Sequence, residues 1–235
     1  MMHEDRGKGY FDENDYNRGI VRSRGLAGVF GLMFLGLLAT AGSALYTLYT
    51  PALFNLVFGT NAFYFFLFAP LALVIFAFPR VWHMPSGAAF ALFFVYALIN
   101  GVTLSVIFLA YDLGTIYLAF FGAAGMFGVM AIYGSVTKAD LSGVGSFLFM
   151  GLIGVIIASV LNWFFASDGL DMLISYAGIA IFLGLTAYDV QRLQRAMNEH
   201  RGEAPTGVMV MGALHLYLDF INIFLFLLRL LGRRR

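Results

Sequence analysis

Seven long apolar runs constrain this chain more than any other feature of its sequence. They cover residues 26–48, 62–78, 87–109, 115–133, 145–165, 170–188 and 208–231. A run of roughly 20 apolar residues is long enough to cross a bilayer as an α-helix, whereas open strands would leave backbone groups unpaired in lipid. With 61% hydrophobic and only 11% charged residues, the chain could not bury its apolar surface as a soluble globule. We therefore predict an all-α membrane protein with seven transmembrane helices.

The distribution of lysine and arginine predicts how these helices are oriented. Residues 1–25 are expected to form an amino-terminal tail, and residues 26–235 a single seven-helix transmembrane domain. Basic residues occur in the tail and in loops two, four and six, but not in loops one, three and five. Because basic loops stay in the cytoplasm, the amino terminus is predicted to be cytoplasmic. Seven crossings then place the basic carboxyl end, with Arg229 and residues 233–235, outside, unless the last run is re-entrant and returns to the cytoplasm.

Several kinds of chemistry are absent from the sequence. The chain has no cysteine, which excludes disulfides and thiolate chemistry. Its net charge of +1 gives no general attraction to nucleic acid. Phosphate-binding loops, His-Glu-x-x-His and Gly-x-Ser-x-Gly are also missing. We expect a protein that is not an enzyme and has no cofactor, with membrane lipids as its surroundings.

Asp219 lies well inside the last apolar run, where a carboxylate is costly. His215, Asp219 and Asn222 follow the spacing i, i+4, i+7, so they share one face of the predicted helix. A polar stripe on an apolar helix must point into the bundle or toward water. The last helix is therefore predicted to be central and surrounded by the other six.

A second aspartate, Asp189, lies at the cytoplasmic edge of the sixth run, close enough in depth to meet Asp219. Two neighbouring carboxylates in a low-dielectric setting cannot both ionise cheaply, so the pair is expected to share a proton and to respond to pH or bind a cation. Simpler roles stay open. Asp189 could be a solvated residue at a helix end, beside Arg192. Asp219 could have a structural role, hydrogen-bonded to a neighbouring helix, and His215 could be a core histidine whose hydrogen bonds are satisfied.

Three further polar side chains have structural explanations of their own. Arg80, at the cytoplasmic end of the second run, is expected to anchor the topology unless it reaches the aspartates. Asn100 and Asn162 are expected to hydrogen-bond between helices.

The last two spans carry a recognisable pattern. AYDVQ at residues 187–191 and LYLDFINIF at residues 216–224 resemble the bacterial branch of the Bax inhibitor-1 family, also called the transmembrane Bax-inhibitor-motif family. NGVTL at residues 100–104 is similar to the family's third span. The resemblance implies six helices around a central seventh, in a multi-pass protein of the bacterial inner (plasma) membrane.

The resemblance also implies a function. Asp189 and Asp219 would form a pH-sensing, calcium-binding pair that gates a calcium leak, so that calcium transport through an ion channel is the implied activity. Arg80 would act as a latch on the pair, and Tyr188, His215 and Asn222 would support it. Some relatives have an acid about three turns before the arginine, but residues 67–71 contain none here.

Two other functions compete with a pH-gated calcium leak. One is a non-conducting regulator that binds a membrane-bound quality-control protease through its tail and helix faces. The other is an intramembrane aspartyl protease, in which the two carboxylates would activate water. The sequence disfavours this protease because Leu216, Tyr217 and Leu218 precede Asp219, where Gly-x-Gly would be expected.

Overall fold

The computed structural model describes residues 13–199 and 205–232, and within these ranges it contains helices and no strands. The elements are α1 (Glu13–Tyr49), α2 (Pro51–Phe58), α3 (Ala62–Ala72), the π-helix η1 (Leu73–Ala77), the 3₁₀-helix η2 (Phe78–His83), α4 (Ser86–Leu104), α5 (Ile107–Ala110), α6 (Leu113–Val136), α7 (Ser142–Phe165), α8 (Asp168–Glu199) and α9 (Thr206–Leu231). Seven helical spans are long and apolar enough to cross a membrane. The predicted all-α, seven-span architecture is confirmed.

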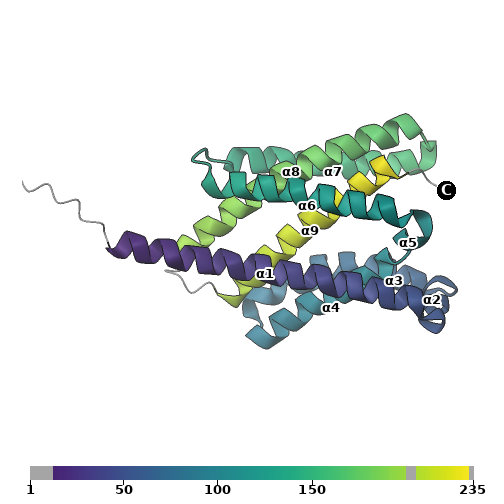
Figure 1. Cartoon of the computed structure of the whole chain (residues 1–235), viewed down its shortest axis with the longest axis horizontal. Helices are drawn as coiled ribbons and strands as arrows, with labels where there is room; N and C mark the ends of the chain where they lie inside the picture. Colours follow the sequence, from purple (N-terminus) through teal and green to yellow (C-terminus); the bar gives the residue numbers. More distant parts are fainter. Residues whose placement is uncertain (1–12, 200–204, 233–235) are drawn as a thin grey trace, which may run out of the picture.

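The last helix, α9, runs obliquely between two groups of helices. Figure 1 shows α6, α7 and α8 on one side of it, and α1, α3 and α4 on the other. It packs against α1, α4, η2, α6 and, most extensively, α8, while α7 packs chiefly on α8. Of the seven spans, α9 has the largest buried share, and Leu214, Leu216 and Ile223 on it are almost inaccessible.

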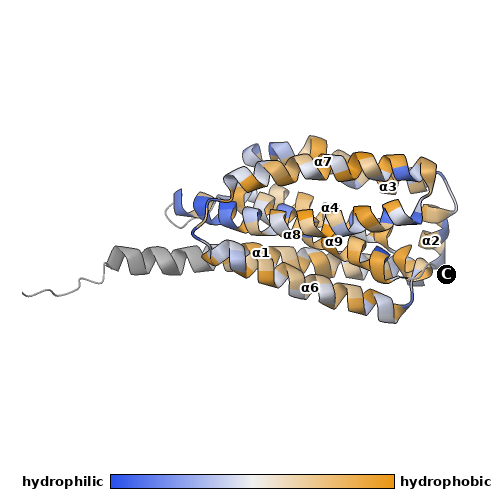
Figure 2. Ribbon diagram, turned by 90° about the horizontal axis from the view of Figure 1, so that it is seen from above, coloured by the Kyte–Doolittle hydropathy of each residue, from blue (hydrophilic) through white to orange (hydrophobic). Residues whose placement is uncertain are grey.

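The outer helices expose their apolar side chains. Figure 2 shows hydrophobic colouring along the bundle and hydrophilic colouring at the helix ends. On α7, Phe147 is 69% exposed and Met150 is 63% exposed. Exposed apolar surface on this scale is incompatible with a water-facing helix, so these faces contact lipid.

Two helices extend beyond the runs predicted from hydropathy. Residues 13–25 of the expected tail continue the first span as part of α1, and the sixth span continues past Tyr188 to Glu199. The polar residues that follow position 188 form helix well, so the helix continues after its apolar section ends. Residues 1–12 of the tail lie outside the described part of the chain.

The second span is interrupted. After α3, which contains Pro70, the chain passes through the π turn η1 and then the 3₁₀ turn η2, which begins with Phe78 and Pro79. Proline removes a backbone donor and crowds the preceding turn, so irregular winding around two prolines is expected. No residue of α3 or η1 is buried, whereas Phe78 and Val81 of η2 are.

The last apolar run does not turn back on itself. It forms one continuous helix from Thr206 to Leu231 and is among the seven candidate spans. The re-entrant alternative is therefore wrong. Near the end of α9, Arg229 forms an ion pair with Asp171 at the start of α8, with 3.3 Å between its Nη1 atom and Oδ1.

Candidate functional site

Asp219 is the acidic residue of α9, and it is buried. The residue as a whole is only 4% exposed. Its Oδ2 atom is buried and has no hydrogen-bond partner among the residues that the structure describes. The polar neighbours on its stripe, His215 and Asn222, are half-buried. Asn222 donates from Nδ2 to the carbonyl of Leu218 at 2.7 Å, so its amide is used within its own helix.

The structure brings Asp189 and Asp219 together. Asp189, half-buried on α8, lies close enough for its charge to act on the carboxylate of Asp219. His215 and Arg192 lie within electrostatic range of Asp189. Two carboxylates from α8 and α9 therefore lie within electrostatic range of each other, and a histidine and an arginine lie within range of Asp189.

Thr186 is part of this site, and the sequence argument missed it. Its hydroxyl lies in hydrogen-bonding range of the Asp219 carboxyl group. The same hydroxyl donates to the carbonyl of Phe182 at 2.8 Å. Thr186 precedes Asp189 by three residues, so the two share one face of α8. The three-residue spacing from Asp189 could have indicated that Thr186 belongs to the site, but a threonine inside an apolar run does not stand out in the sequence as a candidate site residue.

Arg80 does not pair with either aspartate among the described residues. It is exposed on η2, and its Nη1 atom donates to the carbonyl of Phe76 in the same span. This hydrogen bond holds the guanidinium along its own span. The latch contact implied by the family resemblance is therefore not formed in this structure.

Tyr188 serves helix packing. A Cβ atom added at Gly145 of α7 would lie 2.6 Å from carbon atoms of the Tyr188 ring, so the ring fills the space that this glycine leaves. Tyr188, which was expected to support the carboxylate pair, therefore contacts α7 through its ring.

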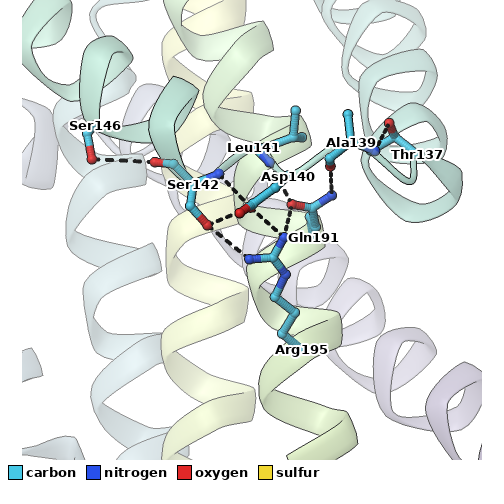
Figure 3. Close-up of polar contacts among 8 residues, drawn as sticks. All are labelled: Thr137, Ala139, Asp140, Leu141, Ser142, Ser146, Gln191 and Arg195. Carbon is cyan, nitrogen blue, oxygen red and sulfur yellow. Dashed lines mark hydrogen bonds and ion pairs between the residues drawn. The ribbon is translucent and has the colours of Figure 1, made fainter.

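The loop between α6 and α7 is fastened to α8 by Gln191 and Arg195, two and six residues beyond Asp189. Gln191 accepts at Oε1 from the backbone N–H of Leu141 (3.0 Å) and donates from Nε2 to the carbonyl of Ala139 (2.8 Å). Arg195 donates from Nη2 to Oδ1 of Asp140 (2.7 Å) and to Oε1 of Gln191 (2.7 Å), and from Nη1 to Oγ of Ser142 (2.9 Å). Figure 3 shows these contacts converging on the loop.

These hydrogen bonds change the titration of Asp140. The donation from Arg195, followed by donations from Ser142, lowers the pKa of the exposed Asp140 carboxyl from 3.8 to about 2. The carboxylate is therefore charged throughout the neutral range, and the loop contact does not respond to pH there.

A buried polar node joins α1, α4 and α9. The hydroxyl of Tyr217 lies 2.8 Å from Oγ1 of Thr40 and accepts a hydrogen bond from Nδ2 of Asn100 at 2.7 Å. Thr40 is also 3.0 Å from the carbonyl oxygen of Ala97. Tyr217 is fully buried.

The asparagine predictions had different outcomes. Asn100 was expected to hydrogen-bond between helices, and this is confirmed by its bond to Tyr217. For Asn162 the same prediction is wrong, because its Oδ1 accepts from the backbone N–H of Ser167, five residues later. At that point α7 ends in the left-handed residue Ala166, and the side chain serves the local turn.

Comparison with known proteins identifies the family. Residues 22–235 match the family model described as "Inhibitor of apoptosis-promoting Bax1". The chain belongs to the Bax inhibitor-1 family. A Bax inhibitor-1 relative, the inner membrane protein YbhL of Escherichia coli, is 43% identical over 215 residues, covering 89% of this chain and 92% of YbhL. A protein of Borreliella burgdorferi is 43% identical over 225 residues, covering 92% of this chain and 94% of its own. The family resemblance is confirmed.

The YbhL name states a location and no reaction. Together with the seven apolar spans, it shows that this Bax inhibitor-1 member is a multi-pass inner-membrane protein. No group of three or more histidine, cysteine, aspartate or glutamate side chains that could hold a metal occurs among the residues described.

Proposed function

We propose that the protein is a pH-sensitive cation leak, with calcium as its cargo, controlled by the pair formed by Asp189 and Asp219. The observation that carries the proposal is the buried Oδ2 atom of Asp219, which has no hydrogen-bond partner among the described residues. A buried carboxylate oxygen left unpaired is costly unless a proton or a cation compensates it.

The hydrogen bonding of Thr186 supports proton exchange at Asp219. A threonine hydroxyl has one proton to donate, and that of Thr186 is directed to the carbonyl of Phe182. The same hydroxyl lies in hydrogen-bonding range of Asp219, but one proton divided between two acceptors does not compensate a buried carboxylate charge. Loss of a proton from Asp219 would leave a negative charge beside Asp189, and this charge would attract a cation in its place.

The composition of the site favours passage of calcium over storage. Calcium in high-affinity protein sites takes six to eight oxygen ligands. Two carboxylates and one hydroxyl from α8 and α9 fall short of that set. Conduction requires a site that binds a cation well enough to admit it and weakly enough to release it, and an incomplete oxygen set meets that requirement.

Calcium flux from reconstituted protein tests the proposal. The full chain, in liposomes loaded with a calcium indicator, is compared with Asp219→Asn between pH 6 and pH 8. We expect flux above that of protein-free liposomes, a clear pH dependence in the wild type, and loss of that dependence in the variant. Glu199→Gln is the matched control, because it removes an exposed carboxylate from the same helix as Asp189.

Two results would count against the proposal. If Asp219→Asn keeps the wild-type flux and pH profile, the aspartate pair has no part in control. If folded wild-type protein passes no more calcium than empty liposomes, conduction itself is refuted.

A further inference from the structure

A polar cleft of about 440 Å³ lies at the end of the bundle opposite the aspartate pair. It is formed where α7 ends, α8 begins and α9 ends, and it is lined by Ser159, Asn162, Trp163, Ala166, Ser167, Asp168, Asp171 and Arg229. Its volume is within the range of small-molecule sites. Neither the proposed leak nor the family pattern in the last two spans uses these residues.

The cleft offers groups of both charges. Arg229 contacts Asp171 through a single pair of atoms 3.3 Å apart, with about a third of each side chain exposed. Its guanidinium carries further donors, held over the ring of Phe226 at 5.5 Å. Asp168 is exposed, and no hydrogen bond or ion pair engages its carboxylate among the described residues. Asn162 uses its Oδ1 atom for the turn, which leaves its Nδ2 group to donate.

Aromatic residues place the cleft at the membrane surface. Trp163, Phe164 and Phe165, at the end of α7, are 84%, 78% and 72% exposed. Tryptophan concentrates at the level of lipid headgroups. The cleft therefore opens where phosphate and amine groups of lipids are locally abundant.

We propose that this cleft binds the headgroup of a zwitterionic phospholipid that carries a phosphate and a primary ammonium group. The phosphate would be held by Arg229 and the Nδ2 group of Asn162, and the ammonium by the carboxylate of Asp168. With two carboxylates and one guanidinium in the lining, the net negative charge disfavours a purely anionic headgroup. A primary ammonium donates hydrogen bonds to a carboxylate, which a trimethylated one cannot do.

Native mass spectrometry of the full chain in detergent tests this assignment. The probes are phosphatidylethanolamine, phosphatidylcholine and phosphatidylglycerol with identical acyl chains. We expect phosphatidylethanolamine to bind about two- to fivefold more tightly than the other two, the range that partly exposed charge contacts provide. Asp168→Asn should bring its affinity down to that of phosphatidylcholine, and Arg229→Gln should weaken all three lipids.

Controls separate binding from folding and from other sources of the same chemistry. The Asp168 carboxylate forms no hydrogen bond or ion pair among the described residues, so its variant stays informative if Arg229→Gln misfolds. Glu199→Gln, at the far end of α8, should keep the lipid preference. Equal binding of the three lipids, or a preference that survives Asp168→Asn, overturns the proposal. Binding of free O-phosphoethanolamine without any lipid preference would assign the cleft to a soluble zwitterion and also overturn it.

Discussion

Replacing Tyr217 with phenylalanine tests whether the buried polar node holds α9 in the centre of the bundle. The change removes one oxygen atom and keeps the ring, which packs edge-on against Phe93 and Tyr96 with ring centroids 6.1 and 5.7 Å away. Thr40 would retain the carbonyl of Ala97 as an acceptor. Asn100 would lose the acceptor for its Nδ2 group.

The expected loss of stability follows from these contacts. Hydrogen bonds between membrane helices contribute on average about 0.6 kcal/mol each, and two such bonds are removed. Leaving the buried amide donor of Asn100 unpaired adds a desolvation cost of about 1 kcal/mol at the low end of its range. The free energy of unfolding of Tyr217→Phe should therefore fall by about 2 kcal/mol.

The assay is reversible unfolding in mixed micelles with increasing SDS, followed by circular dichroism. Tyr117→Phe on α6 is the matched control, because Tyr117 is 59% exposed on the lipid-facing side of its helix and loses the same atom. Combining Thr40→Val with Tyr217→Phe should cost less than the sum of the two single changes, since both remove the same contact. If Tyr217→Phe costs no more than Tyr117→Phe, the node does not stabilise the bundle and the reasoning is refuted.

Two further predictions concern helix packing and the loop. Gly101→Ala should lower the free energy of unfolding by about 1–3 kcal/mol, because its Cβ would collide with Ser43 and with the backbone of Thr40. Gly125→Ala, where nothing lies within 4 Å, should cost nothing in the same SDS titration. Asp140→Asn should speed amide exchange at Leu141 at pH 7, measured by mass spectrometry. Because the folded pKa of Asp140 is about 2, below its usual 3.8, the carboxylate's contribution is complete above about pH 4 and is lost as pH falls toward 2. The effect of Asp140→Asn on the rate of amide exchange at Leu141 should therefore be constant from pH 6 to pH 8, and a change across that window would contradict the assignment.

The number of spans could be predicted from sequence because the transfer of apolar residues into lipid dominates the energetics of such a chain. Hydropathy marks where a helix leaves the hydrocarbon, however, and not where its hydrogen bonding stops. For that reason the extensions of α1 back to Glu13 and of α8 on to Glu199 were not anticipated. The prolines of the second span indicated irregularity, but not that it would take the form of a π turn followed by a 3₁₀ turn.

The sequence could identify a candidate site residue only where placing that residue in an apolar run costs free energy. A carboxylate in an apolar run is conspicuous, so Asp219 could be singled out. Tyr217 could not, because a tyrosine in such a run is equally compatible with lipid, as Tyr64 shows at 60% exposure. The position of Arg80 depended on local winding that charge patterns do not reveal.

The π turn at Leu73–Ala77 determines the direction that Arg80 faces. A π turn accommodates one more residue than an α turn, and each residue of an α-helix advances the chain by about 100°. Uninterrupted α-helical winding through the same stretch would carry the Arg80 side chain about 100° further around the axis of its span. A substitution that converted Leu73–Ala77 to α-helical winding without changing its length would thus re-aim this guanidinium without altering its chemistry, whereas deleting one residue there would leave its direction almost unchanged.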